Sequence, residues 1–194
     1  MAIAQVLDLS RERPIKGEKY LVDTNIWVWV AYAAIRSEAK SMASQYQIEN
    51  YPRFIEEALA DGAILYHTPL ILCELMNVIE SIELDIHKNE SSIAHLEKKA
   101  FRKIAAKRQA VIKYIKLSIG QVKLMSICID SNLDASFVDR SMELLSSTKL
   151  DAYDSYIAIS AKDGKIDYII TDDVDYCDIP KVMVVTANPA SLRK

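Results

Sequence analysis

Four acidic residues stand out because each lies near the point where a predicted strand ends or a predicted helix begins. They are Asp23, Glu74, Asp154 and Asp173. Hard divalent cations such as Mg²⁺ bind carboxylate oxygens and keep several water ligands. Two such cations about 3.5–4 Å apart can activate water and stabilise both oxygens of an in-line phosphoryl displacement. If the fold brings the four carboxylates together, they predict a metal-dependent hydrolytic site.

Each acid also has a structural explanation that involves no chemistry. Asp starts turns, which accounts for Asp23 at a strand end, and a solvated loop accounts for the acids that follow residue 171. Asp151 and Asp154 resemble a capping box, and we interpret Asp151 mainly as the cap and Asp154 mainly as a ligand. Glu74 is the most informative, because its neighbours at 71–73 and 75–76 are all apolar. A carboxylate embedded there needs a partner; an exposed helix face is the alternative.

Short apolar runs rich in β-branched residues predict strands that are covered on both faces of a sheet. Four of these runs follow a glycine and one follows a proline. The predicted strands cover residues 19–23, 63–66, 122–130, 166–171 and 182–185.

Helical patterns fill the gaps between these strands. Thr68 followed by Pro69 indicates a helix start, and Asp134 and Asp151 are predicted helix caps. The predicted helices cover residues 26–37, two segments of 41–60 that meet at Tyr51-Pro52, residues 70–84, a long helix from Ser91 or Ser92 to about residue 119, and two helices that run from the two Asp caps to about residues 147 and 162.

This alternation of strands and helices predicts an α/β, three-layer sandwich around a mostly parallel sheet of about five strands. In open parallel sheets, ligands bind outside the carboxyl ends of the strands. All four acids fall at that edge, so together they carry more weight than any of them alone.

Composition narrows the class of protein. The chain has 194 residues, of which 51% are hydrophobic, enough for one domain with a core. No apolar run reaches the roughly 18–20 residues of a membrane span, so no membrane association is predicted. Cys73, Cys128 and Cys177 are scattered, which predicts a reduced, cytoplasmic protein without disulfides or a thiolate zinc site. The four glycines never share a loop, which excludes a dinucleotide fingerprint and a P-loop.

Several segments resemble the PIN-domain family, and more loosely the VapC-type toxins within it. The segments are Leu21-Val-Asp-Thr-Asn-Ile26, Glu74 after Thr68-Pro69, Tyr153-Asp-Ser-Tyr-Ile-Ala158 and Tyr168-Ile-Ile-Thr-Asp-Asp-Val-Asp-Tyr176. The resemblance implies a parallel-sheet sandwich and a Mg²⁺- or Mn²⁺-dependent endoribonuclease. It also implies that Asp23, Glu74, Asp154 and Asp173 form the acidic metal site. Thr24, Asn25 and Thr171 match polar positions that support it, and Asp175 matches an outer acid.

The chain departs from the family pattern in two places. Residues 85–121 are longer than the helical connection of the small toxins, so we expect one domain over 1–194 with a helical insertion at about 85–121. Position 172 is Asp, which leaves open whether Asp172 or Asp173 faces the metal; the Thr-x-Asp register favours Asp173. Relatives of the toxin type dimerise and are silenced by an antitoxin, so the resemblance also implies a homodimer or an antitoxin-like inhibitor as partner.

The charges are unevenly distributed along the chain. Residues 98–116 carry eight Lys or Arg and no acid, whereas residues 151–178 carry eight Asp and two Lys. Because an acidic site does not attract RNA, the basic block can supply phosphate contacts, with Lys99, Arg102, Lys103 and Lys107 as the candidates. A solvated helix face is the alternative. Trp27 and Trp29 cannot both face inward on one straight helix, so one of them is expected at a partner surface, unless the helix is buried on two sides.

Two other functions compete with the nuclease. One is a catalytically inactive PIN-like module that binds RNA or protein. The other is a phosphatase with Asp23 as nucleophile, but haloacid-dehalogenase-type enzymes place a second Asp two residues later, where this chain has Asn25. His67, His87 and His95 show no metal-ligand spacing and are interpreted as ordinary structural or surface residues.

Overall fold

A fully parallel sheet forms the centre of the computed structural model, which describes residues 4–130, 133–166 and 168–193. Within these residues the sheet has six strands in the order β1-β6-β5-β2-β3-β4. The strands are β1 (Gln5–Asp8), β2 (Lys19–Val22), β3 (Ile64–His67), β4 (Ile127–Cys128), β5 (Tyr168–Ile170) and β6 (Met183–Thr186). Neighbouring β2 and β5 pair Leu21 with Ile169, so their carboxyl ends lie side by side.

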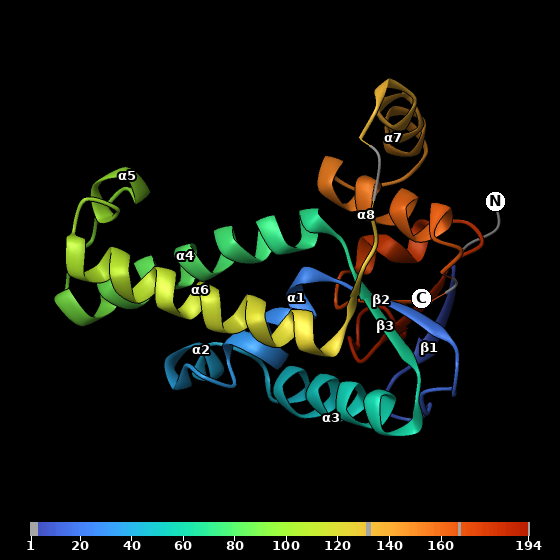
Figure 1. The fold of residues 1–194 in the computed structure, drawn as a ribbon, viewed down its shortest axis with the longest axis horizontal. Coiled ribbons are helices and arrows are strands. Elements are labelled where there is room, and N and C mark those ends of the chain that lie inside the picture. Colours follow the sequence, from blue (N-terminus) through green and yellow to red (C-terminus); the bar gives the residue numbers. More distant parts are fainter. Residues whose placement is uncertain (1–3, 131–132, 167, 194) are drawn as a thin grey trace.

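Helices connect the strands and cover the sheet (Figure 1). They are α1 (Thr24–Trp27), the π-helix η1 (Val28–Tyr32), α2 (Ser37–Ser41), α3 (Gln45–Asp61), α4 (Pro69–Ser91), α5 (Lys98–Phe101), α6 (Ala105–Met125), α7 (Ala135–Ser147), α8 (Ala152–Asp163) and the 3₁₀-helix η2 (Val174–Asp178). Helices α4 and α6 run side by side as an arm that extends away from the sheet, with α5 at its far end (Figure 1). None of the described helices combines the length and apolar character needed to cross a membrane.

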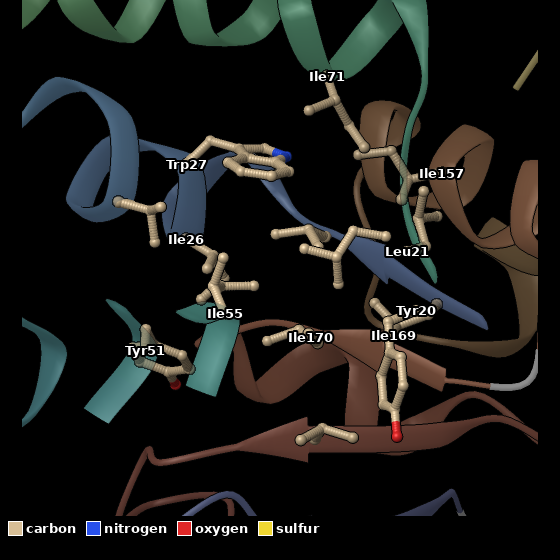
Figure 2. Packing of buried hydrophobic residues seen from close by; sticks show 14 of the residues in the cluster. Tyr20, Leu21, Ile26, Trp27, Tyr51, Ile55, Ile71, Ile157, Ile169 and Ile170 are labelled. Carbon is tan, nitrogen blue, oxygen red and sulfur yellow. The ribbon is translucent and has the colours of Figure 1, made fainter. Parts of the chain in front are cut away.

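The core lies on both faces of the central strands. Tyr20 of β2 meets Phe54 of α3 edge to face, with ring centroids 6.0 Å apart. The next residue, Leu21, points to the other face, where Ile157 of α8 lies (Figure 2). Tyr20, Leu21 and Val22 are at most 2% exposed, and each such burial contributes about 1.5–3 kcal/mol. The predicted strands covered on both faces, and the predicted sandwich, are therefore confirmed.

Two predictions about strands were wrong. β1 was missed, because it lies at the edge of the sheet, where none of its four residues is buried and two of them, Gln5 and Asp8, are polar. The strand predicted at 122–130 shrinks to Ile127–Cys128, because α6 continues through Gly120 to Met125. Burial of Ser118 and Val122 against the rest of the molecule favours helix over the weak helix-breaking effect of one glycine.

Three predictions about helices were also wrong. Helix α3 runs without interruption through Pro52, because Tyr51, Phe54 and Ile55 are buried on either side of it and tertiary packing outweighs the proline. The long helix predicted from residue 91 or 92 to 119 is divided between α5 and α6, because α4 continues to Ser91 and ends at Ser92 in the left-handed conformation (φ 52°). The helix predicted at 26–37 is divided among α1, η1 and α2.

The predicted helix starts were placed more accurately. Thr68, Asp134 and Asp151 each accept a hydrogen bond from a backbone N–H in the first turn of the helix that follows. Gly62 ends α3 with φ 79°, a conformation that glycine adopts without strain. Local side chain-to-backbone bonds therefore define these boundaries, as the sequence predicts.

Candidate active site

Five carboxylates line a cavity of about 300 Å³ at the carboxyl ends of β2 and β5. The lining residues are Asp23, Thr24, Asn25, Val28, Trp29, Glu74, Val78, Asp151, Asp154 and Asp173. The strands bring the acids there directly, since Asp23 follows the last residue of β2 and Asp173 follows β5 by three residues. No Lys or Arg is among the residues that line the cavity, so the acids face one another without a protein cation between them.

Asp23 is the most deeply buried of these acids, at 4% exposure. Its carboxylate accepts hydrogen bonds from the backbone N–H of Thr24 (2.7 Å), from Asn25 Nδ2 (2.9 Å) and from Thr171 Oγ1 (2.7 Å). All three donors are neutral. Burial therefore dominates and raises the Asp23 pKa to about 7, with a further contribution from the nearby charges of Asp154 and Glu74.

Glu74 reaches the cavity from the second turn of α4. Thr24 Oγ1 donates a hydrogen bond of 2.6 Å to Glu74 Oε2. Burial raises the pKa of Glu74, the Thr24 bond opposes that shift, and the charges of Asp151 and Asp173 add to it. Thr24 thus connects two acids of the site, by its backbone N–H to Asp23 and by its hydroxyl to Glu74.

The first turn of α8 contributes two acids with different roles. Asp151 is exposed and caps the helix, accepting a hydrogen bond of 2.9 Å from the backbone N–H of Asp154. Asp154 is half-buried, and its Oδ1 accepts a hydrogen bond of 3.0 Å from the hydroxyl of the buried Tyr176. Burial and the charge of Asp151 raise the Asp154 pKa to about 7.

The structure separates the two adjacent acids after β5. The carboxylate of Asp172 accepts hydrogen bonds from Tyr46 (3.1 Å), Gln47 (2.7 Å) and Tyr51 (2.6 Å) of α3. Asp173 instead lines the cavity and caps η2, where its Oδ1 accepts a bond of 2.8 Å from the backbone N–H of Asp175. Asp175 itself is not among the residues that line the cavity.

Asp172 still influences the site through its backbone. Its N–H donates to Asn25 Oδ1 at 3.3 Å, while the amide of Asn25 donates to Asp23. Thr171, one residue earlier, donates to Asp23 and accepts from the backbone N–H of Asp173 (3.0 Å). Thr24, Asn25 and Thr171 therefore fix the orientation of the acids.

This set of donors suits a hard divalent cation. All of its charged groups are oxygen acids, and the raised pKa values of Asp23 and Asp154 reflect burial and mutual repulsion that a cation would relieve. In the part of the chain that the structure describes, no three His, Cys, Asp or Glu side chains lie close enough to enclose an ion directly. Mg²⁺ usually takes one or two carboxylates and keeps several waters, so the cavity fits such an ion with water completing its shell.

The predicted RNA-binding residues do not lie at this cavity. Arg102 and Arg108 form ion pairs with Glu80, and Lys107 pairs with Glu90 at 3.2 Å. Lys99 and Lys103 are exposed and belong to α5 and the turn after it, at the far end of the arm (Figure 1). Three of the eight basic residues at 98–116 are thus engaged in ion pairs within the arm.

Sequence reasoning did not place two aromatic residues at the acidic site: Tyr176, which bonds Asp154, and Trp29, which lines the cavity. Tyr176 lies in the segment that carries the family resemblance, but nothing in the sequence indicates that its hydroxyl reaches Asp154. Trp29 lines the cavity and is half-buried, whereas Trp27 is fully buried. The spacing of the two tryptophans is the one sequence signal for this difference, since residues two apart point to opposite sides of a helix.

The chain is similar to known proteins over most of its length. A family model described as PIN domain matches residues 20–182. No curated protein matches the chain.

Three solved structures resemble the fold at low sequence identity. VapBC2 from Rickettsia felis, bound to a promoter DNA fragment, is 16% identical over 87% of this chain and 98% of that one, with a TM-score of 0.47. FitAcB from Neisseria gonorrhoeae is 19% identical over 86% and 96%, with a TM-score of 0.45. A toxin–antitoxin complex from Klebsiella pneumoniae is 18% identical over 84% and 94%, with a TM-score of 0.40.

Proposed function

The chain belongs to the PIN-domain family, and from that premise we propose that it is a divalent-metal-dependent endoribonuclease. PIN domains are generally nucleases. The observation that carries the proposal is the cavity at the carboxyl edge of the sheet, where five carboxylates meet without a Lys or Arg among the lining residues. A fold gains nothing in stability from such an arrangement, so its presence favours a function that needs the charge.

Asp23, Glu74, Asp154 and Asp173 are the residues that would hold Mg²⁺ or Mn²⁺. When bound, the metal supplies a water of lowered pKa and offsets charge on the phosphodiester. Thr24, Asn25 and Thr171 hold the acids in place through the hydrogen bonds described above. Tyr176 orients Asp154, and Asp151 fixes the first turn of α8 and adds negative charge at the rim. Asp172 and Asp175 act through their backbone N–H groups.

A melting experiment tests the metal site without knowledge of the substrate. The wild type and Asp23→Asn are melted in Mn²⁺ and in EDTA, with Asp139→Asn, an exposed residue of α7, as the matched control. We expect Mn²⁺ to raise the melting temperature of the wild type and of the control but not that of Asp23→Asn, because only a bound ion stabilises the folded state.

Cleavage of a mixed RNA pool completes the test. A metal-dependent shift together with metal-dependent cleavage supports the nuclease. A chain that neither shifts nor cleaves would instead be a PIN-like module that binds RNA or protein without cutting it.

Three finer proposals rest on the VapC-type resemblance of the four sequence segments. We propose that the enzyme acts as the toxin of a toxin–antitoxin pair in the cytoplasm, silenced by a protein inhibitor, that it forms a homodimer, and that residues 1–194 are one domain with an insertion at 85–121. Growth arrest on expression that Asp23→Asn abolishes would support the toxin role. Sedimentation of the purified chain determines whether it dimerises.

A further inference from the structure

A second cavity adjoins the acidic cavity and shares one wall with it. It has a volume of about 510 Å³ and lies between η1, α3 and α6. Trp29 lines both cavities. The other walls of the second cavity are mostly apolar, with Ile48, Pro52 and Ile55 on α3 and Met125 on α6. Both its size and its apolar walls are typical of a site for a small planar ligand.

Trp29 lies in the π-helix η1. The backbone N–H of Ala33 donates to the carbonyl of Val28 at 2.8 Å, the five-residue step of a π turn, and such turns often occur at functional sites. Two residues earlier, Trp27 lies among the apolar side chains of the core (Figure 2). Trp29 instead packs at the border of the core, where it lines both cavities.

The indole of Trp29 is held in a fixed orientation. It stacks on the ring of Tyr51, with centroids 5.2 Å apart and an interplanar angle of 25°. Tyr51 is fully buried, and its hydroxyl donates to Asp172 at 2.6 Å. The stack therefore connects Trp29 to the same Asp172 whose backbone bonds Asn25 at the acidic site. A rigid aromatic wall of this kind binds another flat ring at little entropic cost.

Polar groups at the second cavity suit a neutral ring with hydrogen-bonding edges. The amide of Gln121 donates a long bond of 3.5 Å to the carbonyl of Val30, and its carbonyl oxygen makes no hydrogen bond among the described residues, which leaves that oxygen for a ligand. Lys40 lines the rim, is exposed and has no ion-pair partner in the described ranges, so it can meet a phosphate. Ser37 and Glu56 are the other polar residues of the lining. Apolar walls with a few hydrogen-bonding side chains and one lysine are compatible with a nucleotide.

We propose that this second cavity is a nucleobase subsite in which Trp29 contacts the base of a nucleotide next to the phosphodiester at the acidic cavity. The inference rests on the proposed nuclease function. Asp23 and Trp29 both line the acidic cavity, so a strand whose phosphodiester lies at the acids passes Trp29. Contact with an aromatic side chain binds any base, so the subsite gives affinity and positions the strand rather than reading its sequence.

Tryptophan fluorescence tests the subsite directly, since the chain has two tryptophans and Trp27 is fully buried. The Asp23→Asn background prevents cleavage, and the probes are a single-stranded hexaribonucleotide and an abasic strand of the same length. We expect the hexaribonucleotide to quench the emission, the abasic strand not to, and Trp29→Phe to lose the quenching. Equal quenching by both strands, or quenching that survives in Trp29→Phe, would overturn the subsite.

A kinetic experiment separates failure of the subsite from failure of the proposed nuclease. Trp29→Ala is expected to raise KM for RNA by about tenfold or more, the size of a base–aromatic contact, with the Mn²⁺-dependent melting shift unchanged. Ala34→Phe is a second variant that fills the cavity from η1's end and leaves Trp29 in place; it should raise KM in the same way. If both variants cleave RNA with the KM of the wild type, the subsite alone is refuted. If the wild type shows neither a Mn²⁺-dependent melting shift nor cleavage, the nuclease is refuted.

Discussion

Helix α4 carries buried or half-buried glutamates into two environments that treat them in opposite ways. Glu74 faces the acidic cavity, where neutral hydroxyl and amide donors surround the acids and burial raises its pKa. Two turns further along, Glu80 is 4% exposed and lies between Arg102 and Arg108. Hydrogen bonding to the Arg102 guanidinium holds the Glu80 pKa below its usual range. One environment leaves negative charge unbalanced and the other balances it.

A third glutamate of α4 repeats the balanced arrangement. Glu83 accepts hydrogen bonds from the hydroxyl of Tyr32 (2.6 Å) and from Arg36 Nε (2.8 Å). We refer to Glu80, Glu83, Arg36, Arg102 and Arg108 as the arm ion-pair cluster. Both buried acids of the arm, Glu80 and Glu83, pair with arginines, whereas the acids of the cavity have no Lys or Arg beside them. None of the eight basic residues at 98–116 lines the cavity. This difference is what we expect if the arm cluster stabilises the fold and the acids of the cavity have the role proposed above.

The largest effect should come from removing an acid of the cavity. We expect Asp23→Asn and Glu74→Gln each to lower kcat for RNA cleavage by more than about 100-fold, since loss of even a residue that supports a metal ligand lowers affinity or activity by about 10–100-fold. In EDTA the melting temperature of Asp23→Asn should fall little. That of Glu74→Gln should fall little or rise, because the substitution removes a repulsive charge. Cleavage within tenfold of the wild type would show that these carboxylates do not form the active site.

Breaking the arm ion-pair cluster should have the opposite signature. Glu80→Gln leaves two arginines without their shared partner, and because both are more than 40% exposed the loss should be about 1–3 kcal/mol rather than the full penalty of a buried pair. For a chain of this size that corresponds to a fall of several degrees in melting temperature. Cleavage below the new transition should be unchanged.

The matched control for this variant is Glu57→Gln. Glu57 pairs with Arg53 one turn away on the surface of α3, and such pairs contribute roughly 0.3–0.5 kcal/mol. Equal destabilisation by the two variants would mean that the arm cluster is no more important than an ordinary surface pair.

The unbalanced charge of the cavity also predicts a pH dependence. Asp23 and Asp154 have pKa values of about 7 in the folded protein against an ordinary value of 3.8. Between those values the folded state binds more protons than the unfolded state, so the free energy of unfolding should fall as the pH rises from about 4 to about 7. Melting in EDTA should therefore be higher by a few degrees at pH 5 than at pH 7.5, and Mn²⁺ should remove that difference. A melting temperature in EDTA that rises with pH over this range would contradict the unbalanced cavity.

The sequence predicts the acids of the cavity well because their positions follow from topology. Asp23 comes directly after an apolar run and Asp173 three residues after another, and parallel strands end at one edge. Glu74 depends on its place within six residues of the Thr68 cap, which is also local. Such short-range signals suffice to place the acids near one another.

The partners of these acids are much harder to predict, because they come from distant parts of the chain. The bond between Tyr51 and Asp172 spans 121 positions, and that between Arg102 and Glu80 joins the turn after α5 to α4. Burial of Tyr51 also keeps α3 helical through Pro52, against local propensity. A pattern of residue types does not predict such pairings. The arm, the stacking of Trp29 and the position of Asp172 are therefore known only from the folded structure.

The smallest effect should come from the basic residues that remain outside the arm cluster. Lys99 and Lys103 are exposed and have no ion-pair partner among the described residues, so Lys99→Glu with Lys103→Glu should weaken RNA binding a few-fold at low salt and reduce the salt dependence of binding by about two phosphate contacts. Because α5 lies at the far end of the arm (Figure 1), kcat at saturating RNA should not change. Lys107→Glu is the informative contrast, since Lys107 pairs with Glu90. This variant should lower the melting temperature and change the salt dependence of RNA binding little. Binding that is insensitive to all three reversals at low salt would make the basic block a structural feature of the arm alone, and the strand would then be held by the second cavity and the metal.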